Sequence, residues 1–222
     1  MRPVAMILSL IAVAVPVPAW AQQPRLHDGV HVRAALGGGY GADRATRESE
    51  SGETQGTVGG AALAGELSAG YAVVPGGIVG AGFYFNHVPS PKAQDIDWRQ
   101  GLGVVHIDEI EFDRGGYWML GPMFDYYPTP SGGLHASLAA GWGVFGLGDG
   151  ELDSGWPVDT NQKGGGISGA LGFGYDFWVA DVLSVGALAR FMIARGSAED
   201  DEGADWTHTV YAPALLLSAS FD

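Results

Sequence analysis

Apolar residues alternate with polar or small residues along several stretches of the chain. Leu183 and Phe191 fall on one face of an extended strand, and Arg190 falls on the other. The stretches 134–144 and 167–177 alternate in the same way. Since successive side chains of a strand point to opposite faces, this period of two predicts strands with one apolar and one mixed face.

The same reading extends to eight segments rich in aromatic, β-branched and glycine residues and bounded by turn-forming residues. They span residues 30–41, 61–74, 78–87, 116–127, 134–147, 167–179, 183–195 and 207–221. Many are longer than ordinary globular strands, which have about 5 to 6 residues. An all-β fold follows.

Short and long connectors alternate strictly between these segments. The short ones are 75–77, 128–133 and 180–182, and the long, hydrophilic ones are 42–60, 88–115, 148–166 and 196–206. This order is typical of a closed antiparallel up-and-down transmembrane β-barrel, with short turns toward the periplasm and long loops outside. The apolar faces would then point outward to lipid. A soluble secreted β-protein with its apolar faces inward, such as a lipocalin-like binder, is the alternative that periodicity leaves open.

Aromatic residues gather near the segment ends, which predicts two girdles at the membrane interfaces. The periplasmic set is Tyr71, Tyr126, Tyr127, Phe177, Trp178 and Phe221, and the external set is Tyr40, Phe83, Tyr84, Phe85, Tyr117, Trp118, Phe145 and Tyr211. Pro122 and Pro213 lie inside segments, where each removes a ladder donor. They predict local bulges or strand boundaries displaced by a few residues.

The first residues predict a secretory leader. Arg2 precedes an apolar stretch at 4–17, which is followed by Pro18-Ala19-Trp20-Ala21, a small-x-small cleavage pattern. We expect a signal peptide at residues 1–21 and an outer-membrane β-barrel domain at 22–222, in a bacterial outer membrane. The chain has no cysteine, so disulfides and thiolate zinc sites are excluded.

With these features the mature chain resembles the small eight-stranded bacterial outer-membrane barrels, the OmpA, OmpX and OmpW-like architecture. The resemblance rests on the whole pattern of segments and not on a diagnostic motif. Members typically end with an aromatic residue that the assembly machinery recognises, and Phe221 stands one position before the last residue here. The resemblance implies that the partners are outer-membrane lipids and that machinery. It also implies that the protein is a monomer.

Charge is unevenly distributed. The formal net charge is -14, and acidic residues concentrate in the long connectors. Such a surface repels phosphate backbones, which argues against nucleic-acid binding. The faces expected to line the lumen carry a sparse polar cluster of Arg33, Glu66, Asp125, Asp176 and Arg190. We expect these charges to pair and fill the lumen, because lone buried charges are costly. A polar pathway for a solute is the functional alternative.

Two patterns suggest chemistry only weakly. His135-Ala136-Ser137 resembles the His-x-Ser pair of outer-membrane lipid A deacylases, but it lies beside a periplasmic turn, and the rest of its segment shows no carboxylate to orient the histidine. Asp200-Asp201-Glu202-Gly203 lacks the spacing of a calcium loop. The sequence therefore predicts no enzyme, and it assigns no catalytic, cofactor or metal residue.

A structural or surface-interaction role follows as the first functional expectation, in which a rigid barrel displays acidic external loops. The alternative is a narrow channel, or a barrel that binds or transports a hydrophobic small molecule.

Overall fold

The computed structural model describes residues 26–49, 52–100, 103–152, 157–158, 163–199 and 205–222. The expected leader at 1–21 lies outside the described residues, and so does the acidic run at 200–203. The described part forms twelve strands. They are β1 (Val30–Ser49), β2 (Gly52–Val74), β3 (Gly77–Val88), β4 (Lys92–Gln100), β5 (Gly103–Phe112), β6 (Gly115–Tyr126), β7 (Leu134–Leu147), β8 (Gly150–Leu152), β9 (Pro157–Val158), β10 (Lys163–Trp178), β11 (Leu183–Glu199) and β12 (Asp205–Phe221).

Among the described residues, none forms a helix with the length and apolar character that crossing a membrane requires.

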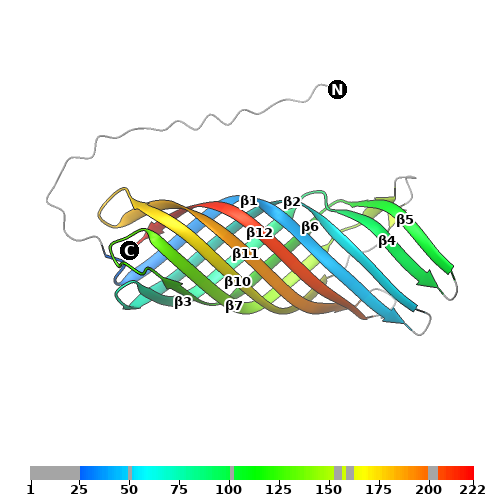
Figure 1. Ribbon diagram of the computed structural model, residues 1–222, viewed down its shortest axis with the longest axis horizontal. Coiled ribbons are helices and arrows are strands. Elements are labelled where there is room, and N and C mark those ends of the chain that lie inside the picture. Colours follow the sequence, from blue (N-terminus) through cyan, green and yellow to red (C-terminus); the bar gives the residue numbers. More distant parts are fainter. Residues whose placement is uncertain (1–25, 50–51, 101–102, 153–156, 159–162, 200–204) are drawn as a thin grey trace, which may run out of the picture.

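Eight strands close into a barrel. Neighbours follow the order β1, β12, β11, β10, β7, β6, β3, β2, and a further pairing of β2 with β1 completes the circle. Every pairing is antiparallel. Figure 1 shows the strongly tilted strands wrapping around a common axis. The predicted all-β, closed antiparallel barrel of about eight strands is confirmed.

The two ends of the barrel differ. One end, here called the turn end, carries three short turns, the start of β1 and the end of β12. The other end, the loop end, carries the long connectors. In the turn between β2 and β3, Pro75 is followed by Gly76 at φ 77°, a backbone conformation that glycine adopts without steric cost. In outer-membrane barrels short turns face the periplasm, so we expect the loop end to face outward.

The two faces of the wall have opposite character. In β11 the side chains of Val185, Phe191 and Ile193 are exposed, whereas Leu188 and Met192 are buried in the lumen. Leu171 in β10 and Leu215 in β12 are also exposed on the outside. The apolar face of each strand therefore points away from the barrel axis, toward lipid, as the alternation predicted.

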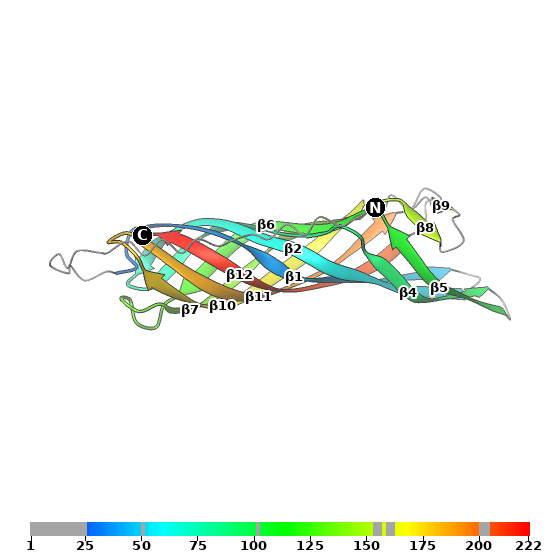
Figure 2. The same ribbon diagram turned by 90° about the horizontal axis from the view of Figure 1, so that it is seen from above.

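Strand boundaries agree closely with the predicted segments at the turn end, but the long connectors are not all loop. β1 continues beyond Gly41 to Ser49 and β2 begins already at Gly52, and the two strands pair up to these residues. The connector 88–115 folds into the β4–β5 hairpin, which adds to the edge of β2 and extends beyond the barrel (Figure 2). The hairpin was hard to predict because the connector is hydrophilic, and only Ala93, Ile110 and Phe112 of its described side chains are buried apolar residues.

The two prolines cause no bulge, which corrects the prediction. Pro122 stays in register with Ala81 of β3. On its other side the β6–β7 ladder skips Gly121 and Pro122 and resumes at Met123 in an unchanged register. Pro213 likewise leaves the register of β12 unchanged on both sides. The N–H of a strand residue faces only one neighbour, so a proline costs a single ladder bond there.

The aromatic girdles are smaller than predicted. Tyr84, Tyr117, Tyr127 and Phe145 are buried in the lumen, whereas their chain neighbours Tyr126 and Trp118 are exposed on the outer wall. The period of two explains the difference, because consecutive aromatic residues cannot share a face. Clustering along the sequence therefore overstated the number of aromatic residues that can reach the lipid interface.

Candidate functional site

The five charged residues predicted to line the lumen come from five strands and meet inside the barrel. They form the lumen ion cluster, and each is at most 3% exposed: Arg33 of β1, Glu66 of β2, Asp125 of β6, Asp176 of β10 and Arg190 of β11. Each occupies an inward position of the pleat. They converge only because the barrel closes.

Arg33 lies at the centre of this cluster. It forms an ion pair with Asp125, and its Nη1 lies 3.5 Å from Glu66 Oε1. Its Nη2 donates a hydrogen bond of 3.2 Å to the hydroxyl of Tyr127. The planar guanidinium group can serve several acceptors at once, which suits a cation buried among carboxylates.

Arg190 ties the cluster to the wall toward the loop end. Its Nη1 donates to the carbonyl of Gly65 over 2.6 Å, and its Nη2 donates to the carbonyl of Phe85 and to Asn86 Oδ1 over 3.1 and 3.0 Å. Glu66 Oε2 lies 3.7 Å from Arg190 Nη1, so this one carboxylate bridges both arginines.

Asp176 joins the cluster to the turn end. It accepts hydrogen bonds from the hydroxyls of Tyr127 at 2.9 Å and Ser218 at 3.1 Å. The Nδ1 atom of His135 lies 3.3 Å from Asp176 Oδ2. The histidine thus has a carboxylate partner on a neighbouring strand, which inspection of its own segment could not show. Among the described residues, no hydrogen bond joins His135 to Ser137.

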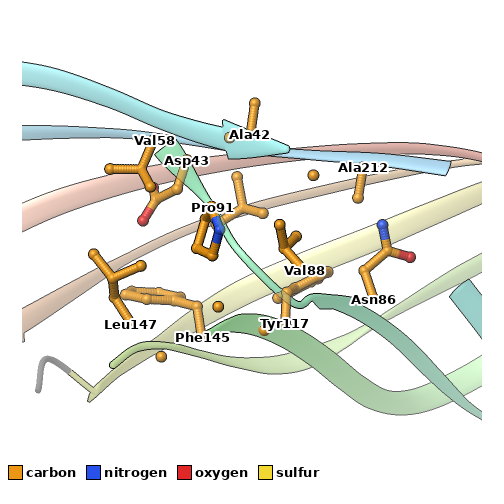
Figure 3. Close-up of a pocket in the computed structure, with 16 residues that line it drawn as sticks. Ala42, Asp43, Val58, Asn86, Val88, Pro91, Tyr117, Phe145, Leu147 and Ala212 are labelled. Atoms are coloured by element: carbon orange, nitrogen blue, oxygen red, sulfur yellow. The ribbon is translucent and has the colours of Figure 1, made fainter. Parts of the chain in front are cut away.

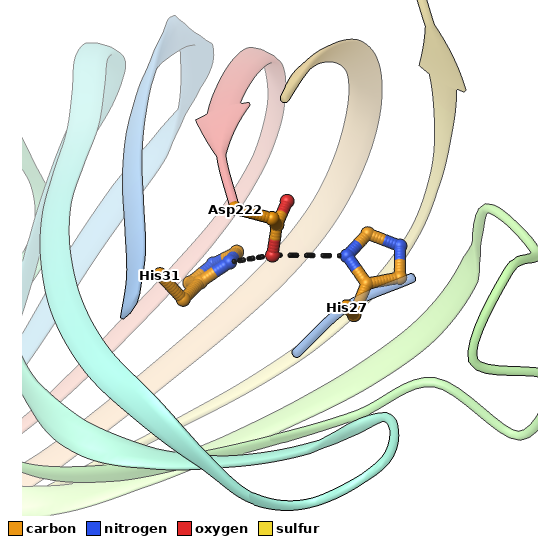
Figure 4. Close-up of side chains that lie close together, drawn as sticks. All are labelled: His27, His31 and Asp222. Carbon is orange, nitrogen blue, oxygen red and sulfur yellow. Dashed lines mark hydrogen bonds and ion pairs between the residues drawn. The ribbon is translucent and has the colours of Figure 1, made fainter. Parts of the chain in front are cut away.

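A second polar group closes the turn end (Figure 4). His27 precedes β1, His31 lies at its start and Asp222 follows β12. The Nδ1 atoms of the two histidines lie 3.0 and 2.7 Å from Asp222 Oδ1. Burial alone would raise the pKa of Asp222, but the two histidines beside its carboxylate outweigh burial and hold that pKa below its usual range.

A pocket lies inside the barrel near the loop end (Figure 3). Its lining is mostly apolar or glycine: Gly41, Ala42, Asp43, Val58, Gly59, Asn86, Val88, Pro91, Gly115, Gly116, Tyr117, Phe145, Gly146, Leu147, Val210 and Ala212. Beside it, Ala93, Ile110 and Phe112 of the β4–β5 hairpin pack with Val58 and Leu147. The hairpin therefore covers part of the loop end with apolar contacts.

Sequence reasoning missed several residues of these sites. Tyr127 was expected at the lipid interface, and Asn86 carried no signal. His31 could have been found, because it lies two residues before Arg33 on the same face of β1. His27 and Asp222 lie outside the strands at opposite ends of the described chain, and no spacing along the sequence connects them.

No protein-family model matches the chain, and no curated protein matches its sequence. Solved structures do resemble it. The outer membrane protein OprG from Pseudomonas aeruginosa is 14% identical with a TM-score of 0.52, over 90% of this chain and 99% of OprG. Neisserial surface protein A is 13% identical with a TM-score of 0.43, over 87% and 97%. AlkL in lipid bilayers is 12% identical with a TM-score of 0.48, over 95% and 97%.

At 14% identity, the structural likeness to OprG establishes the fold of this chain and nothing beyond the fold. With the outward apolar wall, it defines the class: this chain is a small eight-stranded outer-membrane β-barrel protein, as the sequence resemblance implied. The bacterial outer membrane is its location, because a closed barrel with an apolar exterior requires lipid around it.

Proposed function

We propose that the protein binds a small, largely apolar molecule that carries a hydrogen-bond acceptor, in the pocket at the loop end of its lumen. The observation that supports this most is the pocket itself, which has an apolar lining and one oriented amide donor. Concave apolar sites with a few placed polar groups are the usual form of small-molecule sites.

The donor is Asn86. Its Oδ1 accepts from Arg190 Nη2, and this bond fixes the orientation of the amide. The Nδ2 group is then left as a buried donor with no partner among the described residues. A buried donor without a partner costs about 1 to 3 kcal/mol, so a ligand acceptor placed there would gain binding energy.

The lumen ion cluster supports binding in place of conduction. Arg190, which orients Asn86, is also the link from the pocket to Glu66 and Arg33. A solute that crossed the barrel would have to separate these buried pairs, and open channels generally have many more strands. We therefore expect no steady openings in planar bilayers, and steady single-channel currents would contradict a sealed lumen.

Binding can be tested with two probes of similar shape, acetophenone and ethylbenzene, added to the protein in lipid nanodiscs. Because only the ketone accepts a hydrogen bond, we expect it to bind about tenfold more tightly, as one well-formed hydrogen bond would give. Saturation-transfer NMR and calorimetry measure the difference. Asn86→Asp keeps the acceptor for Arg190, removes the amide donor and should abolish the preference.

Matched variants locate the site. Ala212 lines the pocket and is fully buried, whereas Ala189 faces outward on the neighbouring strand. We expect Ala212→Leu to fill the pocket and weaken binding, and Ala189→Leu to leave it unchanged. The proposal would be contradicted if each probe bound the Ala212→Leu variant as tightly as it binds the wild-type protein.

A surface-interaction role is the second candidate, favoured by the strand pairing that continues beyond the apolar wall. The β4–β5 hairpin adds to β2 outside the barrel, and Lys92 Nζ lies 3.4 Å from Glu111 Oε2 across it. Such a frame could display the acidic connectors to envelope components or other surfaces. Deleting residues 92–112 should remove binding to envelope components or other surfaces, while the barrel should still show its heat-dependent gel mobility.

A further inference from the structure

The histidines at the turn end have the chemistry of a metal site. His27, His31 and Asp222 each offer one ligand atom, and these three atoms lie within 4.8 Å of one another. Their side chains are 0%, 1% and 2% exposed. The group is separate from the loop-end pocket and plays no part in the proposed binding there.

The hydrogen bonds of His27 leave a lone pair aimed at the carboxylate. Its Nε2 lies 3.1 Å from the carbonyl oxygen of Gly132, which can only accept, so Nε2 carries the hydrogen. In the neutral ring Nδ1 is then unprotonated and faces Asp222 Oδ1 at 3.0 Å. Two acceptors so close repel each other unless a proton or a metal ion lies between them.

The other two members also have free ligand atoms. His31 Nδ1 contacts Asp222 Oδ1 at 2.7 Å, while its Nε2 is buried without a partner among the described residues. Asp222 Oδ2 is buried without a hydrogen-bond partner as well. Buried polar atoms normally have partners, and His27 Nδ1, which faces Asp222 Oδ1, has no hydrogen-bond partner either, so the polar atoms of this group are left unsatisfied.

The surroundings hold the group in place. The ring of Tyr127 stacks on His27 at 3.5 Å between centroids, and Trp178 lies at 4.8 Å. The backbone N–H of His27 donates to Pro130, and that of Asp222 donates to Val182, in two different turns. A histidine whose second ring nitrogen donates to a backbone carbonyl is the usual arrangement around a bound metal, because it fixes the tautomer.

We propose that His27, His31 and Asp222 bind a divalent transition-metal ion of the zinc class, with water in the remaining position. Two imidazoles and one carboxylate suit Zn²⁺ and its neighbours and not Ca²⁺ or Mg²⁺, which take oxygen ligands. Tetrahedral bonds of about 2.0 to 2.1 Å place ligand atoms about 3.3 Å apart. The two nitrogen–carboxylate distances of 3.0 and 2.7 Å would therefore lengthen by a few tenths of an ångström, whereas the spread of up to 4.8 Å within the group would have to contract.

The ion would hold the first and last strands of the barrel together. β1 and β12 pair with each other, Val32 opposite Phe221, and the three ligands flank this pair at the turn end. Because a metal bound only by the folded state favours that state, it would stabilise barrel closure.

The test uses untagged protein freed of metal with a chelator, then refolded with or without metal because the ligands are buried. Binding of Co²⁺ is followed by its visible d–d absorption, and binding of Zn²⁺ is measured by calorimetry. X-ray absorption gives the number of imidazoles around zinc in the wild-type protein. We expect one ion per chain, two imidazoles, displacement of Co²⁺ by Zn²⁺, and an unfolding midpoint shifted to higher urea.

Three variants, His27→Phe, His31→Phe and Asp222→Asn, should each weaken Zn²⁺ binding at least tenfold. His208→Phe is the matched control, because His208 Nδ1 lies 2.7 Å from Asp43 Oδ2 at the loop end, in a pair that has no second histidine within the described residues. That control should bind normally. Absence of one-to-one binding by the wild-type protein, zinc with fewer than two imidazoles, or loss of binding only in His208→Phe would overturn the proposal.

Discussion

The hydroxyl of Tyr127 donates a hydrogen bond of 2.9 Å to Asp176 Oδ2. The hydroxyl oxygen of Tyr127 also accepts a hydrogen bond from Arg33, so one phenol links the arginine pairs in the middle of the lumen to the carboxylate shared with His135. The stacking of Tyr127 on His27 extends this link to the turn end. Polar contacts inside the barrel therefore form one connected network, and changes at single residues should be felt beyond their own pairs.

Loss of the central arginine should destabilise the barrel strongly. Arg33→Met leaves Asp125 and Glu66 buried without this partner, and removing one member of a buried pair costs about 3 to 5 kcal/mol. Urea unfolding in lipid vesicles measures the change. Arg195→Met, at an exposed arginine of strand β11, is the control and should change stability little. Equal stability of both variants would show that the cluster contributes no net energy.

Removing only the linking hydroxyl should have a smaller effect. Tyr127→Phe keeps the ring against His27 but leaves Asp176 and Arg33 each short of one hydrogen bond, at a cost of about 1 to 3 kcal/mol. The adjacent Tyr126 points outward and is exposed, so Tyr126→Phe serves as the matched control. The prediction fails if the two variants unfold at the same urea concentration.

Labelling from the bilayer should follow the pleat of β11. The chain contains no cysteine, so single-cysteine variants report without background. Val185→Cys and Phe191→Cys should react with a lipid-soluble thiol probe, because these side chains are 40% and 41% exposed on the outer wall. Leu188→Cys, which is 1% exposed in the lumen, should not react. Labelling at Leu188 alone would reverse the assignment of inside and outside.

The cost of a charge on the outer wall should depend on depth. Leu171 lies midway along β10, between Leu138 and Phe191, whereas Leu183 begins β11 at the turn end. We expect Leu171→Lys to lose about 2 to 4 kcal/mol and Leu183→Lys about 0 to 1 kcal/mol, because lysine reaches water more easily near the interface. Unfolding in vesicles gives both values. Similar losses at the two positions would argue against a bilayer around this wall.

Local pattern alone determined which residues form the wall and which face they occupy. The alternation in β11 and the alternation of short and long connectors predicted the closed barrel, since a strand has only two faces and lipid demands an apolar one. The same rule placed Arg33, Glu66 and Asp176 inward. Beyond Gly41 and in the β4–β5 hairpin the connectors are hydrophilic, so the pattern along the sequence predicts loops where the structure has strands.

Only the tertiary structure decided which inward residues meet. Arg33 and Asp125 come from strands far apart in the sequence, and Asp176 reaches His135 from the next strand of the circle. The group of His27, His31 and Asp222 exists because the first and last strands pair. The physical reason is that the direction of a side chain depends on the local backbone and on the alternation of apolar and polar residues along one strand. The distance between two side chains across the lumen depends instead on strand order, register and closure of the barrel.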